Sequence, residues 1–447
     1  MRAFSLSIRA LSGFLLFLFV AAFGVAGFAF AQEGPPKVYD EVRQPPGRVY
    51  APDEFIVKFK EGIYESRVAR INAEHGTEVI ETSRVAGFKR LRVPSGKTVE
   101  QVVEAYRREP DVEYAEPNYI LSASFVPNDP YYRYQWNLDN PANSGDINAE
   151  SAWDIQQGGN PSVIVAIVDT GVAYEDFGKF KRAPDLAQTA FVAGYDFVSG
   201  DTHPNDENSH GTHVCGTIAQ STHNSLGVAG VAFKTAIMPV RVLNKSGSGT
   251  TTAVANGITF ATNNGAKVIN LSLGGSASTT LENAVRYAYE HGVTVVAAAG
   301  NGGPTGSPNY PAAYDAYVIA VAATRYDEAV APYSTRGSYV DVAAPGGDTG
   351  VDQNGDGYGD GILQNTFNPT TKNVKEFGYW FFQGTSMATP HVSGLAALLI
   401  ANGASSPAAV REATEKTARD RGPVGRDDGY GVGLIDANAA LQYVPAP

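Results

Sequence analysis

The chain has 447 residues, of which 43% are hydrophobic and 11% aromatic, so it can build a large core and is not a disordered protein. Its net charge of −12 comes entirely from residues 125–447, which carry 18 basic and 30 acidic side chains, whereas residues 1–124 carry 16 of each. This acidity argues against a nucleic-acid-binding protein and favours hard cations as ligands, while the length suits two or three domains.

Residues 1–31 have the pattern of a secretory signal peptide. Arg2 and Arg9 give a positive start, residues 10–29 form an apolar run, and residues 29–31 (Ala-Phe-Ala) form a small-x-small cleavage site. The apolar run is also near the length of a membrane span, so an uncleaved anchor is the alternative. The cleavage site favours a secreted, extracellular protein. No later stretch is long and apolar enough to cross a membrane.

A proline-rich polar stretch, residues 32–52, is typical of a linker, and a small α+β pattern follows it. Alternating or helical spacing predicts, in chain order, a strand at 54–60, a helix at 64–75, strands at 77–83 and 88–93, a helix at 98–108 and a strand at 112–115. This βαββαβ order predicts a ferredoxin-like unit over about 53–121.

From residue 152 onward the sequence has short apolar runs without alternation. They lie at 163–168, 236–242, 268–273, 293–298 and 318–321, with helical spacing at 251–262 and 281–291. Unbroken apolar runs that alternate with helices predict an α/β domain, with a buried parallel sheet and helices on both faces. In such sheets the working site lies beyond the carboxyl ends of the strands. The residues directly after the runs are therefore candidates for chemistry.

Three candidate residues occur in the order Asp169, His210, Ser386. Taken alone, Asp169 could be a carboxylate in a turn, His210 could be half of a weak metal-binding motif, and Ser386 could be a helix cap. A lipase or esterase elbow needs glycine two residues after the serine, where this chain has Ala388. Together they suit nucleophilic catalysis, because a serine hydroxyl needs an imidazole to take its proton and the imidazole needs a carboxylate to orient it.

The stretches VAIVDTGV, HGTHVCGTIA, NLSLGG, AAAGN and GTSMATPHVSG resemble the signature blocks of the subtilisin-like serine proteases. VRVLNKSGSGT, GAKVINLSLGG and NDPYYRYQWN are similar to the thermitase branch of that family. The resemblance implies a subtilisin-like fold and a broadly specific serine endopeptidase with Asp169, His210 and Ser386 as its triad. It also implies that Asn301 holds the oxyanion together with the Ser386 N–H. A calcium-dependent binding module with a vestigial triad is the alternative.

The resemblance further implies two strands that clasp a peptide substrate, made of Gly247, Ser248 and Gly249 on one side and Ser272, Leu273 and Gly274 on the other. Asn309 matches the base of the primary pocket, where the family often has glycine, so the pocket's preference stays open. The only cysteine, Cys215, excludes an internal disulfide. It stands one place later than in some relatives, and we interpret it as a small buried apolar residue rather than a reactive thiol.

The stretch DQNGDGYGDGIL resembles a calcium loop. Carboxylate or amide oxygens occupy loop positions one, three, five and nine and Gly357 the sixth, but Leu363 stands where an EF-hand has its closing glutamate. Because the flanking sequence is not helical, we expect a static calcium site rather than a sensor. A flexible polar loop is the alternative. The expected ligands are Asp352, Asn354, Asp356, Tyr358 through its carbonyl, and Asp360.

The resemblance implies two more structural calcium sites, hence two to three ions in all. The first would use Asp129, Asp185 and Asn224 with backbone oxygens of Ser221, Leu226 and Val228. The second would use Asp196, Asp201 and Asn205 with the backbone oxygen of His203.

The resemblance also implies a precursor in which residues 32–124 are a propeptide and residues 125–447 the peptidase domain. The propeptide would assist folding, lie in the cleft as an added strand over residues 121–124, and be removed by the enzyme itself. Alignment of VEYAEPNYIL with the end of such propeptides places the cut between Ser124 and Phe125, within three residues. We expect a monomer that acts on polypeptides.

Overall fold

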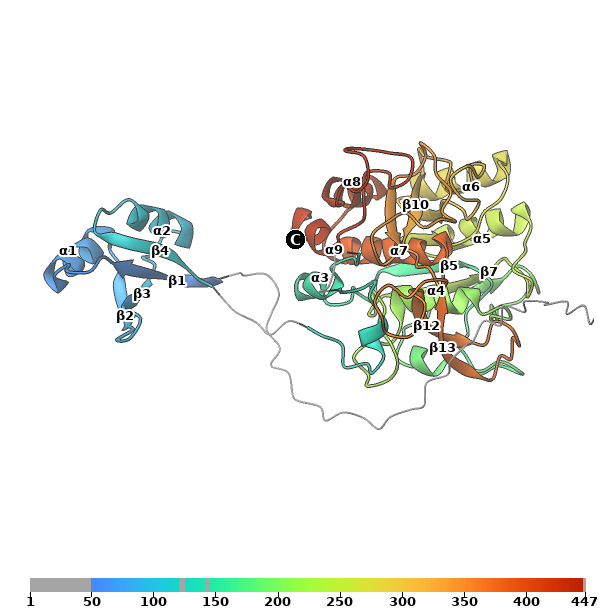
Figure 1. Cartoon of the computed structure of the whole chain (residues 1–447), viewed down its shortest axis with the longest axis horizontal. Coiled ribbons are helices and arrows are strands. Elements are labelled where there is room, and N and C mark those ends of the chain that lie inside the picture. The colour runs from blue at the N-terminus through green and yellow to red at the C-terminus, as the bar shows by residue number, and fades with distance from the viewer. Residues whose placement is uncertain (1–49, 120–124, 141–144, 445–447) are drawn as a thin grey trace, which may run out of the picture.

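The computed structural model describes residues 50–119, 125–140 and 145–444. The signal peptide, most of the linker and residues 121–124 lie outside these residues, so the expectations about them remain predictions. Figure 1 shows two units, a small one in blue and a larger one that runs from teal to red.

The small unit has the predicted βαββαβ order and an antiparallel sheet in the order β2-β3-β1-β4. Phe55, Leu91 and Tyr106 are fully buried in its core. The first and last strands of the unit, β1 and β4, extend beyond the prediction, because Tyr50 in the expected linker pairs with Tyr119. Pro117 is tolerated because β4 is an edge strand. The elements are β1 (Tyr50–Phe59), α1 (Glu65–His75), β2 (Glu78–Thr82), β3 (Phe88–Arg92), α2 (Val99–Arg107) and β4 (Val112–Tyr119).

The larger unit is built on a parallel seven-stranded sheet in the order β11-β10-β9-β8-β5-β7-β6. All five predicted apolar runs are strands of this sheet. The two-residue β6 and the four-residue β11 were not predicted, because they are too short for a pattern. The strands are β5 (Ile164–Asp169), β6 (Tyr195–Asp196), β7 (Ala236–Arg241), β8 (Val268–Leu271), β9 (Thr294–Ala298), β10 (Val318–Thr324) and β11 (Val342–Pro345).

Helices cover both faces of the sheet, as predicted (Figure 1). Alternate strand residues serve the two cores: Val165 and Ile167 of β5 face one, Ala166 and Val168 the other. One face carries α5 (Thr251–Asn263) and α6 (Thr279–Glu290), and the other carries α3 (Ala149–Ile155), α4 (His210–Ala219), α7 (Thr385–Ala401), α8 (Pro407–Thr417) and α9 (Ala437–Tyr443). Among the described residues, no helix combines the length and apolarity needed to cross a bilayer.

A hairpin of β12 (Ile362–Phe367) and β13 (Phe377–Phe382) packs on α4. The ring of His213, on α4, stacks on Phe382 with centroids 4.3 Å apart, and its Nε2 lies 2.9 Å from the carbonyl oxygen of Ile362. Burial lowers the pKa of His213 to about 3, so the ring is neutral. The hairpin therefore fixes the helix that begins at His210. Short 3-10 turns lie at η1 (Tyr132–Tyr134) and η2 (Pro184–Leu186).

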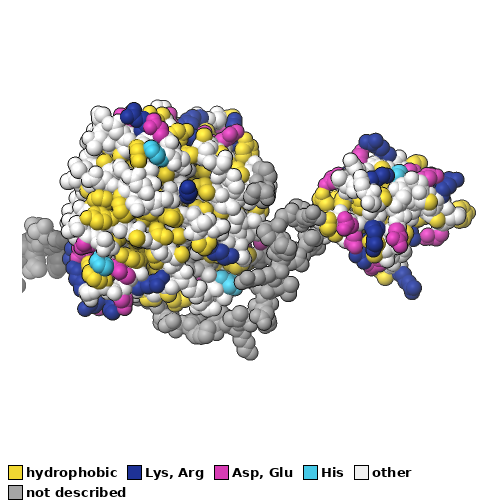
Figure 2. Space-filling view, turned by 180° about the vertical axis from the view of Figure 1, so that it is seen from behind, with side chains coloured by type: hydrophobic (Ala, Val, Ile, Leu, Met, Phe, Trp, Pro, Cys, Tyr) yellow, Lys and Arg dark blue, Asp and Glu magenta, His cyan; other side chains and the backbone are white. Residues whose placement is uncertain are grey.

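On the face shown in Figure 2, the lysine and arginine side chains of the larger unit are scattered and form no continuous stripe. This distribution agrees with the acidic balance of residues 125–447.

Candidate active site

Asp169 and His210 meet where β5 ends and α4 begins. His210 Nδ1 lies 2.8 Å from Asp169 Oδ1, and the carboxylate is fully buried. Burial lowers the pKa of His210, but the negative charges of Asp169 and Asp206 raise it by more. The pKa of His210 therefore lies above its usual 6.5. The contact favours the tautomer with its proton on Nδ1, which leaves Nε2 able to accept a proton.

Ser386 is the second residue of α7, whose N-cap is Gly384 with φ 146°. Its Oγ donates to the Ser272 carbonyl at 3.2 Å, and Ser272 Oγ donates to the Ser386 carbonyl at 2.8 Å. The hydroxyl therefore rests against the strand expected to bind substrate. Catalytic hydrogen bonds are often formed only once substrate is bound, so a resting contact of this kind is compatible with a nucleophile.

Asn301 lies beyond the end of β9 and is held by the residue before Ser386. Its Oδ1 accepts the backbone N–H of Thr385 at 2.9 Å and the Thr385 hydroxyl at 3.0 Å. Because the amide oxygen is occupied in this way, the Nδ2 group is free to point elsewhere as a donor. Asn301 was predicted from its motif, but the orienting role of Thr385 was not.

A cleft of about 490 Å³ runs beside His210. It is lined by all six residues of the two expected substrate strands: Gly247, Ser248, Gly249, Ser272, Leu273 and Gly274. Asn309, the expected base of the primary pocket, lies behind Gly274. A Cβ on that glycine would come within 2.0 Å of Asn309 Nδ2. The Asn309 amide also donates to the Ala298 carbonyl at 2.8 Å, so this side chain occupies the space between the two segments.

Comparison with known proteins identifies the family. Residues 160–433 match the sequence model of the subtilase family, Peptidase S8, and residues 36–118 match the fervidolysin N-terminal prodomain. The chain belongs to the subtilase family. It is therefore a serine endopeptidase with an N-terminal prodomain, and the alternative of a binding module with a vestigial triad is not favoured.

The relatives of this subtilase match most of its length. A thermophilic serine proteinase of Bacillus sp. (strain AK1) is 40% identical over 398 residues, which cover 88% of each chain. Thermitase of Thermoactinomyces vulgaris is 44% identical over 71% of this chain and 100% of its own. A solved protease structure from Pseudoalteromonas arctica PAMC 21717 is 33% identical, with a TM-score of 0.61 over 72% of this chain and 100% of its own.

A second buried carboxylate, Asp206, organises the turn before His210 and was not predicted. It accepts the hydroxyls of Thr170 and Thr212 at 2.9 and 2.7 Å and the backbone N–H of Asn208 at 2.7 Å. Burial raises its pKa. No sequence motif marks Asp206, because its partners come from the residue after β5, from α4 and from the turn itself, and only the fold brings them together.

The first expected calcium set places two buried carboxylates together. Asp129 and Asp185 are 4% and 0% exposed, and Asn224 donates to Asp185 Oδ1 at 2.9 Å. Burial raises the pKa of Asp129 to about 6 and that of Asp185 well above its usual range. Among the ion pairs of the described residues, neither has a lysine or arginine partner. The backbone N–H groups of Ser221, Leu226 and Val228 donate to Asp185 and Asn224, which places these residues beside the two carboxylates. Two buried carboxylates without a cationic partner fit a hard cation.

The second expected calcium set differs from the first in how its carboxylate is balanced. Asp196 Oδ2 forms a buried ion pair with Arg241 at 2.9 Å, and its Oδ1 accepts two backbone N–H groups. Asp201 Oδ1 accepts the N–H of His203, and Asn205 instead donates its amide to Glu175 at 2.8 Å. Arg241 already balances Asp196, so this set differs from the first, although Asn205 Oδ1 is buried with no hydrogen-bond partner among the described residues.

The third set, the 352–360 loop, closes on itself through carboxylate and amide oxygens. Asp352 accepts from Gly355 and Gly357, Asn354 from Asp356, and Asp356 from Tyr358. Asp360 Oδ1 is buried with no hydrogen-bond partner among the described residues. Burial and then the charges of Asp352 and Asp356 raise the Asp360 pKa. A buried oxygen without a hydrogen-bond partner, near two further carboxylates, fits a cation. In the described part of the chain, however, no three or more His, Cys, Asp or Glu side chains lie close enough together to form a metal cluster.

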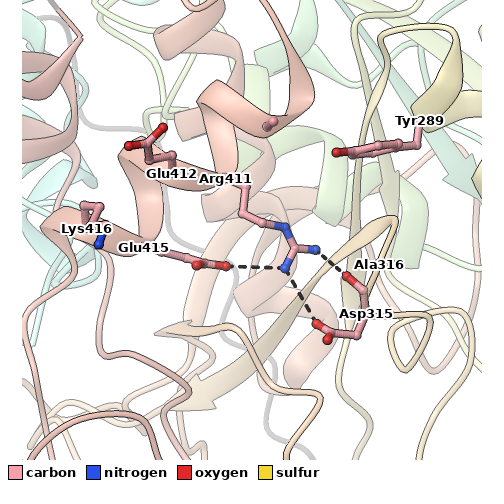
Figure 3. A pocket seen from close by; sticks show the side chains of 8 residues that line it. Tyr289, Asp315, Ala316, Arg411, Glu412, Glu415 and Lys416 are labelled. Atoms are coloured by element: carbon pink, nitrogen blue, oxygen red, sulfur yellow. Dashed lines mark hydrogen bonds and ion pairs between the residues drawn. The ribbon is translucent and has the colours of Figure 1, made fainter.

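Two remaining features are structural. Cys215 is fully buried on α4, and burial raises the pKa of its thiol, which agrees with the apolar interpretation. A second pocket, of about 320 Å³, is lined by Tyr289, Asp315, Ala316, Ala408, Arg411, Glu412, Glu415 and Lys416 (Figure 3). Its central Arg411 is held by Asp341 at 2.9 Å and Glu415 at 3.3 Å, so its charge serves to fasten α8 to the sheet.

Proposed function

We propose that this subtilase is a secreted, calcium-stabilised endopeptidase of broad specificity, made as a precursor that processes itself. The observation that carries the proposal is the buried Asp169–His210 pair beside a cleft, with Ser386 at the start of α7 and Asn301 fixed next to it.

The substrate would enter as an extended strand between residues 247–249 and 272–274. Ser386 Oγ attacks the scissile carbonyl while His210 Nε2 takes its proton, and Asp169 stabilises the resulting imidazolium. Asn301 Nδ2 and the Ser386 N–H donate to the oxyanion of the tetrahedral intermediate. His210 then protonates the leaving amine, and water hydrolyses the acyl-enzyme by the same steps in reverse order.

Substrate preference follows from which groups line the cleft. Five of the six strand residues that line it are serine or glycine, so recognition relies on backbone hydrogen bonds, which tolerate many sequences. Asn309 fills the space behind Gly274 and so favours small or polar side chains at the primary position.

Calcium would be held by the first set (Asp129, Asp185, Asn224) and by the 352–360 loop. A bound ion supplies positive charge to buried carboxylates and stabilises the native state by mass action, without taking part in the chemistry. The first set joins the start of the peptidase unit to the loop at 221–228, and the third lies in the loop between β11 and β12.

The signal-peptide pattern supports secretion, and the prodomain match with its ferredoxin-like fold supports an inhibitory propeptide over residues 32–124. The cut would fall between Ser124 and Phe125.

Casein hydrolysis by wild type and by Ser386→Ala tests the proposal. We expect Ser386→Ala to lose about 10⁶-fold in kcat, the magnitude known from subtilisin itself, while Ser338→Ala at an exposed site keeps full activity. Substantial hydrolysis by purified Ser386→Ala would overturn the assignment of the nucleophile.

A further inference from the structure

The start of the peptidase unit lies in a pocket rather than in solvent. The backbone nitrogen of Phe125 donates to Asp154 Oδ1 at 3.0 Å, and the Phe125 ring is only 8% exposed. The ring meets Trp153 edge-on and stacks on Phe233, both with centroids 5.7 Å away, and contacts His223 at 5.3 Å. Chain ends are usually poorly held, so a buried aromatic side chain here indicates a specific role.

We propose that this pocket is the receptor for the amino terminus that processing creates, with Asp154 as the counter-ion of the Phe125 α-ammonium. The inference rests on the proposed function for the position of the cut. Hydrolysis of the Ser124–Phe125 bond consumes one water and leaves a carboxylate on Ser124 and an ammonium on Phe125. The nitrogen that donates to Asp154 thereby changes from a neutral amide into a cation, and charge-assisted hydrogen bonds are the stronger kind.

The pocket is joined to the first calcium set through one loop. The backbone N–H of His223, whose ring contacts Phe125, donates to Asp129 Oδ2 at 2.7 Å. Two residues further on, the N–H of Ser225 donates to Asn128 Oδ1 at 2.8 Å. Docking of the new terminus therefore holds the segment that carries Asp129 against the loop that supplies the other ligands. Cleavage would strengthen the mature enzyme at the same time as it releases the propeptide.

The test compares one substitution in two forms of the protein. Asp154→Asn is made in the mature enzyme, blocked with a serine-directed phosphonate against autolysis, and in the full precursor carrying Ser386→Ala. Unfolding is followed by tryptophan fluorescence, because the chain's only tryptophans, Trp136, Trp153 and Trp380, all belong to the larger unit. We expect mature Asp154→Asn to unfold about two- to fivefold faster than its parent, the range for an exposed ion pair. The precursor, in which the same nitrogen is a neutral amide, should change less.

Asp176→Asn is the matched control, since exposed Asp176 also accepts a backbone N–H, that of Arg182 at 2.9 Å, away from any chain end. It should affect both forms equally. Asp154→Glu, which keeps the charge, should retain more of the mature enzyme's stability than Asp154→Asn. Equal destabilisation of mature and precursor forms by Asp154→Asn would overturn the proposal.

Terminal sequencing separates this inference from the proposed function. An active mature enzyme that begins at a residue other than Phe125 would overturn the pocket's role and leave the peptidase assignment intact. A precursor that is neither processed nor active would instead count against the proposed function.

Discussion

His210 is the residue whose protonation sets the activity of the site. As general base it must be neutral, and its pKa stands above the usual 6.5 because the Asp169 and Asp206 charges outweigh burial. We therefore expect kcat/KM to fall as the pH drops below that raised pKa. In Asp169→Asn the acid limb should move to lower pH and kcat should drop about 10⁴-fold. A pH–rate profile measures both, with Asp176→Asn as the control, and an unmoved acid limb would contradict the pairing.

Asn301 stabilises only charge that develops during the reaction. Asn301→Ala should lower kcat by about 10² to 10³ and leave KM nearly unchanged, a magnitude taken from subtilisin rather than from this chain. Steady-state kinetics on a peptide anilide separate the two constants. Asn256→Ala on the exposed side of α5 is the control. A change confined to KM would show that Asn301 binds substrate instead.

The sequence predicts Asp169, His210, Ser386 and Asn301 as site residues because each lies in a contiguous motif at the end of a strand or the start of a helix. It did not find Thr385 as the residue that orients Asn301, nor Asp206, nor the Arg241 that balances Asp196. Those roles arise from side-chain contacts between distant segments, and such contacts leave no local pattern.

Among the elements, the 352–360 loop makes the sharpest prediction about metal. Asp360→Asn turns a buried carboxylate, whose Oδ1 has no hydrogen-bond partner among the described residues, into a neutral amide, so calcium loses a ligand. We expect equilibrium dialysis to show one fewer bound ion and thermal inactivation in calcium to become faster.

With excess chelator, wild type and Asp360→Asn should inactivate at the same rate, both faster than calcium-loaded wild type. Asp348→Asn, just outside the loop, should behave as wild type. A difference between wild type and Asp360→Asn that persists in chelator would mean that Asp360 acts without calcium.

The strands show where sequence patterns succeed and fail. Buried parallel strands were recognisable as apolar runs, but β12 was not, because its buried Gln364, Asn365 and Thr366 read as loop residues. They are tolerated inside because each donates to a backbone carbonyl, those of Ala229, Gly378 and Ser209. The sequence therefore did not predict the hairpin of β12 and β13 that fixes α4.

For the whole molecule, self-processing predicts that Ser386→Ala accumulates as a folded precursor. In the proposed self-processing the enzyme's own site removes the propeptide, so loss of the nucleophile should leave the two units joined. Intact mass after expression in a host without other proteases checks this outcome. Mature-sized protein from Ser386→Ala in such a host would refute self-processing and leave cleavage to another enzyme.

Labelling with a serine-directed phosphonate tests most directly whether Ser386 is a nucleophile activated by His210. Peptide mapping of the mature enzyme should find one adduct, on Ser386, and none in a His210→Ala variant matured by added protease. An adduct on another serine, or equal labelling without His210, would contradict the mechanism.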